Sequence, residues 1–269
     1  MKYIVLTLLA AQMAAPRTFA AGSKKTSQAI KKPEASVAVS TTATNLPQFS
    51  PSTSPITVPF AIEQFERFDR EMATLTATFR QTVRSDDTGQ TQAVEGRFAY
   101  RKKDLMRIEH RAPERQTLVC DGQRVWVWRP SNNQVIRSRL EDWKRSQPLA
   151  QGILDFGNYA QLLRRYDVSV GTVSSPGSDG HRNFSLVLTP RPEAGAAKQE
   201  PFTLTLRLST RDFFPYDSEL RVGSVTASTL FHAVRYNPEL PENLFQFSPP
   251  AGADVLEFPA APAPGTRQP

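Results

Sequence analysis

Short segments that favour extended structure follow one another along most of this chain, separated by little more than turns. They are rich in β-branched and aromatic residues, and several alternate apolar with polar side chains. They cover residues 75–83, 93–101, 105–110, 116–120, 124–129, 134–139, 167–172, 183–189, 202–208, 218–222 and 226–236, with a shorter candidate at 244–247. Consecutive strands with such short links predict a single antiparallel meander. A sheet of that many strands in one domain curls, because strand twist accumulates across it.

Two turns give the clearest hairpin signals. One is Asp121-Gly122, and the other is the Pro-Ser-Asn-Asn run at 130–133. Gly and Asn tolerate the positive φ that tight hairpins require. The register of the neighbouring strands should therefore be set at these two positions.

Helical patterns occur at two places. Ile62, Phe65, Phe68, Met72 and Leu75 recur at steps of three and four residues, which predicts an amphipathic helix before the first strand. Between residues 141 and 165, large apolar residues at helix-like spacing predict two short helices that interrupt the meander. These inserted helices would cover the apolar inner face of the curved sheet and enclose a cavity.

The front of the chain has the pattern of an export signal. Lys2 is followed by an apolar run and by small residues up to Ala21, which predicts a cleavable signal peptide at residues 1–21 and a soluble exported protein. An uncleaved anchor is the alternative, and Pro16 and Arg17 disfavour it because they interrupt a longer apolar helix. Residues 22–59 are rich in Ser, Thr, Ala, Pro and Lys, and 259–269 in Pro and Ala. Such compositions predict a disordered tether and tail around one domain at 60–258.

The formal charge of +7 invites a nucleic-acid hypothesis. Six basic residues and one acidic residue lie within residues 1–60, whereas 27 basic face 25 acidic residues in the remainder. Binding through counterion release needs many cations clustered on a folded surface. A nearly neutral folded domain behind a basic leader therefore disfavours nucleic acid as the ligand.

Patterns for catalysis are weak in this sequence. His110, His181 and His232 lack the spacing of a metal site, and no GxSxG, GxGxxG or P-loop motif occurs. The single cysteine, Cys120, excludes a disulfide-stapled fold and is expected to be a buried apolar filler. We expect no enzymatic activity, no cofactor and no metal.

Nine short motifs follow one another along the chain. They are GRFAY (96–100), RIE (107–109), APERQTLV (112–119), DG (121–122), VWVW (125–128), NQV (133–135), LVLTP (186–190), NP (237–238) and FQFSPPAGADV (245–255). This ordered set resembles the LolA family of periplasmic outer-membrane lipoprotein carriers. The resemblance runs from about residue 60 to 257. It implies a mainly β fold with a few helices: a single curved antiparallel sheet forming an incomplete, unclosed β-barrel. An N-terminal helix and inserted helices form a lid over a hydrophobic cavity.

The family resemblance also implies a function and a location. The protein is expected to be a periplasmic monomer that holds the acyl chains of lipoproteins. It would receive them from an inner-membrane lipoprotein-releasing ABC transporter (LolCDE-like) and deliver them to the outer membrane, to a LolB-like acceptor if one is present. The physical need is clear, because each CH₂ group moved out of water is worth ~0.8 kcal/mol.

Candidate cavity residues come from strand alternation and the family pattern. They are Phe79, Phe98, Tyr100, Met106, Ile108, Leu118, Trp126, Trp128 and Leu186. Ordinary core packing is the alternative for each of them. The face of the two tryptophans stays open, because Val125 and Val127 make both faces of that strand apolar. Leu149, Ile153 and Leu154 are the lid candidates, with simple helix-to-sheet packing as the alternative.

One departure from the family pattern concerns the lid. Where the family carries an Arg-Pro pair after the second strand, with its Arg facing the cavity mouth, this chain has Lys102-Lys103. Lys102 keeps the charge but lacks the planar donor fork of arginine. We expect Lys102 to contact the lid, and a solvated charge run at 101–104 is the alternative.

Two other functions remain open from sequence. An RseB-like periplasmic sensor would use the same groove to detect lipids or lipoproteins rather than ferry them, and a lipid-ester hydrolase is the weaker alternative. A LolB-like receptor is disfavoured, because the lipidated cysteine of such a receptor has no counterpart near the predicted cleavage point.

Overall fold

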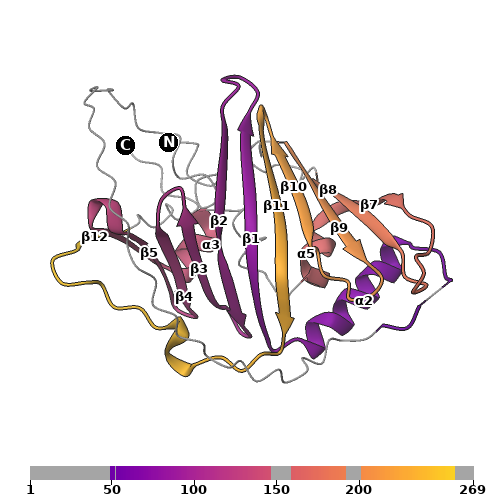
Figure 1. The fold of residues 1–269 in the computed structure, drawn as a ribbon, viewed down its shortest axis with the longest axis horizontal. Coiled ribbons are helices and arrows are strands. Elements are labelled where there is room, and N and C mark those ends of the chain that lie inside the picture. Colours follow the sequence, from indigo (N-terminus) through magenta and orange to yellow (C-terminus); the bar gives the residue numbers. More distant parts are fainter. Residues whose placement is uncertain (1–48, 52, 147–158, 192–200, 258–269) are drawn as a thin grey trace, which may run out of the picture.

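A computed structural model describes residues 49–51, 53–146, 159–191 and 201–257 of the 269-residue chain. In these residues twelve strands form one sheet in the order β12-β6-β5-β4-β3-β2-β1-β11-β10-β9-β8-β7. The sheet is strongly twisted and open, with β12 and β7 at its two edges (Figure 1). The fold is thus mainly β, with an unclosed barrel-like sheet and a few helices, as the sequence predicts.

The strands agree closely with the sequence prediction. Their bounds are β1 Thr74–Ser85, β2 Thr91–Arg101, β3 Leu105–Ala112, β4 Gln116–Asp121, β5 Arg124–Arg129, β6 Gln134–Arg139, β7 Tyr166–Val173, β8 Asn183–Pro190, β9 Phe202–Ser209, β10 Asp217–Val222, β11 Val225–Tyr236 and β12 Asp254–Glu257. Neighbours pair antiparallel except β12, which pairs parallel with β6. Gly122 and Asn133 adopt positive φ at the two predicted turns, at 86° and 49°.

The helix α2, Val58–Glu71, precedes the sheet. The Thr57 side chain caps its start by accepting a hydrogen bond from the Phe60 N–H (3.3 Å). The helical spacing runs on through Met72 and Leu75, but the helix ends at Glu71. Met72 is already extended, and Leu75 lies in β1, near the start of the predicted strand 75–83. Asn237 explains the break: its Oδ1 accepts hydrogen bonds from the N–H groups of Ala73 and Thr74, and its Nδ2 donates to Glu71 O.

In the described part of the segment between β6 and β7, two short helices interrupt the strands. They are α3, Leu140–Ser146, and α5, Tyr159–Arg165. Helix α3 contacts β5 and β6, whereas α5 contacts α2 and β7. The lid candidates Leu149, Ile153 and Leu154 lie outside the described residues, so their role stays a prediction.

The segment after β11 differs from the prediction. The candidate strand at 244–247 is wrong, because Glu242–Phe245 forms a 3₁₀ turn (η2). The chain then continues to β12, a strand that the sequence patterns did not reveal. We call residues 238–257 the strap: η2 contacts β3 and β4, and β12 pairs with β6. In Figure 1 the strap runs from the lower end of β11 to β12 at the edge of the sheet.

None of the helices in the described ranges has the length and apolar content needed to cross a membrane.

Candidate functional site

The inner face of the sheet, which faces α2, is built from rows of side chains on hydrogen-bonded strands. Directly paired residues form a first row of Tyr236, Leu75, Tyr100, Met106, Cys120, Val125 and Ser138. A second row joins Ala77, Phe98, Ile108, Leu118, Val127 and Ile136. Every first-row member is buried, and the second row is wholly apolar. Seven adjacent strands, β11 and β1 to β6, therefore present a continuous and almost entirely apolar surface.

Most of the predicted cavity residues lie together on this face. Phe79, Phe98, Tyr100, Met106, Leu118 and Leu186 are all buried in one hydrophobic cluster. Ile108 is half-buried and packs against the same cluster. The structure thus brings these residues together, and their contact with a lipid is a proposal.

The two tryptophans do not belong to that cluster. Trp126 is buried with Val119 and Val135 in a separate cluster, against which Trp128, Phe247 and Ala253 pack. This cluster lies on the outer face, beneath the strap. The prediction that Trp126 and Trp128 share the cavity face is therefore corrected. The reason is strand parity, because Val125 and Val127 take the inner positions of β5.

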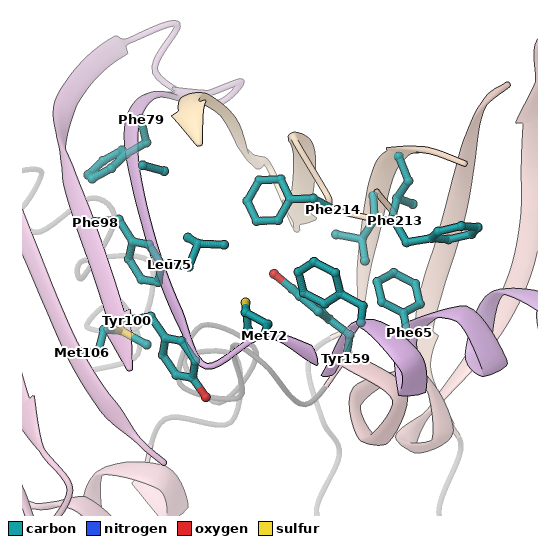
Figure 2. Packing of buried hydrophobic residues seen from close by; sticks show 14 of the residues in the cluster. Phe65, Met72, Leu75, Phe79, Phe98, Tyr100, Met106, Tyr159, Phe213 and Phe214 are labelled. Atoms are coloured by element: carbon teal, nitrogen blue, oxygen red, sulfur yellow. The ribbon is translucent and has the colours of Figure 1, made fainter. Parts of the chain in front are cut away.

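A second group of aromatic side chains faces the sheet from the other side. Figure 2 shows Phe65 of α2, Tyr159 of α5 and the pair Phe213 and Phe214 opposite Phe98, Tyr100 and Met106 of β2 and β3. We call Phe65, Phe68, Tyr159, Phe213 and Phe214 the opposite wall, and the first two rows with Phe79 the strand wall. Ring centroids lie 5.2 Å apart for Phe65–Tyr159 and 5.8 Å apart for Phe214–Tyr236.

Phe213 and Phe214 were not among the candidates identified from the sequence. Neighbours in a strand point to opposite faces, yet both rings are only 1% exposed. Phe213 has a φ of 51°, and this turned backbone lets two consecutive side chains enter the core. The sequence did contain one signal for these residues: two adjacent aromatic side chains stand directly before Pro215, between two predicted strands.

Gly96 lets Phe79 join the strand wall. A Cβ atom at Gly96 would lie 2.6 Å from Phe79 Cζ and 2.3 Å from Glu109 O, which are impossible contacts. The glycine of the GRFAY motif therefore provides the space in which the Phe79 ring lies. The same ring packs edge-on against His110, with centroids 5.8 Å apart.

Polar contacts between α2 and α5 join the two closing helices. Asp69 Oδ2 accepts a hydrogen bond from the Ala160 N–H (3.2 Å), and Arg164 forms an ion pair with Glu66. Burial raises the pKa of Asp69 to about 6, against the lowering effect of the α5 backbone N–H groups.

Lys102 lies at the same junction. Its Nζ donates a hydrogen bond to Asp69 O, so its described contact is with α2. The charge of Lys102 also favours the ionised carboxylate of Asp69. The predicted contact between Lys102 and the lid candidates involves residues outside the described ranges and stays a prediction.

Two buried titratable groups of the described strands, Cys120 and His110, have strongly shifted pKa values. Burial raises the pKa of the Cys120 thiol to about 11 and lowers the pKa of His110 to about 4, so both are uncharged at neutral pH. Cys120 is buried within the first row, as predicted. Among the described residues no group of three or more His, Cys, Asp or Glu side chains is placed to hold a metal ion.

A family model and curated relatives match most of this chain. The family described as outer membrane lipoprotein carrier protein LolA matches residues 70–248. An outer-membrane lipoprotein carrier protein of Hahella chejuensis is 30% identical over 187 residues, which cover 70% of this chain and 83% of that protein. One from Neisseria meningitidis is 28% identical over 196 residues, covering 73% and 86%. The solved structure of a LolA superfamily protein from Nitrosomonas europaea has a TM-score of 0.38 at 14% identity, covering 72% of this chain and 99% of that one.

Proposed function

This chain belongs to the LolA family of outer membrane lipoprotein carrier proteins, and from that premise we propose that it ferries lipoproteins from the inner membrane to the outer membrane. The acyl chains are held between the strand wall and the opposite wall. The observation that carries the proposal is the continuous apolar surface of the first two rows, faced by aromatic side chains from separate elements.

The physical argument rests on the cost of exposing acyl chains to water. Each CH₂ group transferred out of water gains ~0.8 kcal/mol, so a triacylated cysteine needs an apolar site wherever it leaves a membrane. A carrier must also release its cargo. An apolar site closed by separate helices, rather than by one continuous core, binds the chains less tightly than a membrane does and permits downhill delivery.

Movement of the opposite wall is the step that such delivery requires. Phe231 of β11 connects the two walls, because its ring lies 5.6 Å from Phe214 and 6.3 Å from Phe98 by centroid distance. Edge-to-face ring contacts of this kind contribute about 0.5–1.5 kcal/mol each beyond area burial. A few such contacts, together with the polar links of Asp69 and Glu66, are small enough for lipid chains to replace.

The proposed partners follow from the route. Acylated lipoproteins are the cargo, an inner-membrane lipoprotein-releasing ABC transporter (LolCDE-like) is the donor, and a LolB-like protein is the acceptor if one is present. The protein works as a periplasmic monomer after removal of residues 1–21. No catalytic step is part of this function.

Native mass spectrometry tests the cargo. Protein purified from its own periplasm, with a lipoprotein overproduced, should carry a mass increment equal to one triacylated lipoprotein. Complete absence of bound lipoprotein under these conditions contradicts the proposal.

A spheroplast release assay tests delivery. Added protein should release newly made lipoprotein from spheroplasts in soluble form and then transfer it to outer-membrane fragments. Binding without transfer would instead identify a sensor that uses the same site.

A further inference from the structure

The inner face changes from apolar to polar along its strands. Beyond the second row, the next paired positions on β1 to β6 are Phe79, Gly96, His110, Gln116, Arg129 and Gln134. This third row is the one farthest from α3, because α3 follows directly after Arg139 at the first-row end of β6. The polar positions therefore lie at the end of the strand wall that α3 does not cover.

Side-chain contacts join the polar members of the third row. His110 and Gln116 are directly opposite on β3 and β4. Arg129 Nε donates to Gln116 Oε1 at 3.3 Å, which leaves the Gln116 Nε2 group as a donor. Gln116 is only 9% exposed, and His110 and Arg129 are half-buried, so all three inner-face groups are partly shielded from water.

Gln81 adds a buried acceptor on β1, which β2 separates from the β3 strand of His110. It is the next inner position of β1 after Phe79 and is 1% exposed. Its Nε2 donates to Thr229 Oγ1 of β11 at 2.8 Å. Its Oε1 has no hydrogen-bond partner among the described residues, and a buried acceptor without a donor is unfavourable. The missing group is an N–H or O–H donor.

The charges of the surrounding side chains restrict which kind of donor group a ligand can bring to Gln81 Oε1. Arg129 is the one ion among Gln81, His110, Gln116 and Arg129, because burial lowers the pKa of His110 to about 4 and keeps its ring neutral. None of the four is a carboxylate that would compensate a buried ammonium group. The ligand that matches them has carbonyl oxygens for His110 and Gln116 and an uncharged N–H for Gln81.

We infer, resting on the proposed function, that Gln81, His110, Gln116 and Arg129 form a subsite for the uncharged head of an N-acylated lipopeptide. Its amide N–H donates to Gln81 Oε1, and its ester and amide carbonyls accept from His110 and Gln116. The acyl chains extend from there along the second row towards the first. This polar band orients the cargo, so that the peptide leaves at the third row and the chains enter the apolar end.

Binding of paired synthetic lipids tests the inference on the full mature chain. The first probe is a dipalmitoylglyceryl-cysteinyl peptide with an N-acetyl group, and the second is the same peptide with a free amino terminus. Both carry the same two chains, so only the amide N–H and the charge differ. Dipalmitoyl phosphatidylglycerol is the third probe, because it shares the ester groups but has no amide N–H.

The wild-type protein should bind the N-acetylated peptide roughly tenfold more tightly than the free amine. Gln81→Leu should reduce that preference to about twofold and leave the affinity for phosphatidylglycerol unchanged. His110→Leu should weaken all three probes about fivefold, because each carries ester carbonyls. Thr78→Val, on the outer face of the same strand as Gln81, is the matched control and should bind as the wild type does.

Three results would overturn the assignment. They are equal wild-type affinities for the two peptides, a preference that survives in Gln81→Leu, and a loss of phosphatidylglycerol binding in Gln81→Leu as large as the loss of peptide binding. If Gln81→Leu fails to fold, Gln81→Met applies the same test with a more flexible side chain. Failure of the wild type to bind any lipopeptide would contradict the proposed function itself, whereas equal binding of both peptides contradicts only the subsite.

Discussion

Two apolar clusters lie on opposite faces of the same strands and are closed in different ways. The outer cluster of Val119, Trp126 and Val135 is covered by the strap, which is anchored by polar contacts along its length. Arg101 donates to Leu240 O (2.7 Å), Asn133 Nδ2 donates to Gly252 O (2.7 Å), and β12 pairs with β6. The inner cluster is closed by apolar and aromatic side chains from α2, α5 and residues 213–214.

The difference matches the proposed function, which needs the inner face to open and the strap to stay in place. Backbone hydrogen bonds and Arg-to-carbonyl contacts hold the strap in one register, whereas aromatic contacts on the inner face are individually weak and non-directional. Alternating aromatic residues in a strand thus support stability on the outer face and, under the proposed function, ligand binding on the inner face.

Trp126→Ala should have the largest effect on stability. The substitution removes a buried ring that packs against Phe247 and donates to Asp121 Oδ2 at 3.1 Å. Urea unfolding should show a loss of about 3–5 kcal/mol in the free energy of unfolding. Trp128→Ala, which truncates a half-buried ring of the same cluster, should cost about 1–2 kcal/mol. A Trp126→Ala variant that folds normally but loses lipid binding would contradict the division between the two faces.

His110→Gln tests the burial of His110 on the inner face through the pH dependence of the free energy of unfolding. Folding lowers the pKa of His110 from 6.5 to about 4, so the unfolded chain binds the proton first as pH falls. The wild type should therefore lose about 2–3 kcal/mol of stability from this residue between pH 6.5 and 4, and none above pH 6.5. The difference in free energy of unfolding between His110→Gln and the wild type should grow in favour of the variant over that range. A difference independent of pH would show that His110 is not buried.

Asp69→Asn tests the helices that close the inner face. The pH dependence of stability that Asp69 causes is opposite in direction to that of His110. Burial raises the pKa of Asp69 from 3.8 to about 6, so the folded protein binds the proton first as pH falls. Protonation of Asp69 therefore stabilises the folded protein by about 2 kcal/mol below pH 4. This contribution is lost as the pH rises through 6. Asn carries no charge at any pH and keeps an acceptor for the Ala160 N–H. The free energy of unfolding of the variant, relative to the wild type, should therefore increase as pH rises from 4 to 6. Parallel curves of stability against pH would contradict this.

Ile108→Ala should separate stability from binding on the strand wall. Ile108 is half-buried in the second row, opposite Phe98 and Leu118. We expect a loss of about 1 kcal/mol in the free energy of unfolding, because part of the side chain is already exposed. Lipopeptide affinity should fall about fivefold, since roughly 1 kcal/mol of acyl contact is also lost. A loss of stability without a change in affinity would place Ile108 in the structural core alone.

The sequence was most informative where the signal is local. Alternation located the strands from β1 to β11, and turn chemistry at Gly122 and Asn133 located two hairpins. The end of α2 was not evident because Leu75 continues the helical spacing, while the hydrogen bonds that end the helix come from Asn237, more than 160 residues away. No local window contains that information.

The candidate site was predicted less completely for related reasons. β12 is a four-residue edge strand with every side chain exposed, so it has no alternation to detect, and its parallel partner β6 is remote in sequence. Trp126 was assigned to the wrong face because β5 is apolar on both. The opposite wall and the polar third row became visible only with the register, which places Phe214 near Phe231 and His110 beside Gln116.

Lys102→Leu should give the smallest change in stability. The Lys102 side chain is exposed, and its described contact is one hydrogen bond to Asp69 O, so the free energy of unfolding should change by less than about 1 kcal/mol. Its removal also takes a positive charge from beside the Asp69 carboxylate, which should loosen the α2–α5 junction and speed transfer of bound lipoprotein to an acceptor membrane. Lys103→Leu, at the adjacent exposed position, is the matched control in the spheroplast release assay. Equal transfer rates for the wild type and both variants would show that closure of the inner face does not depend on Lys102, and the comparison between the two faces would then rest on the aromatic contacts alone.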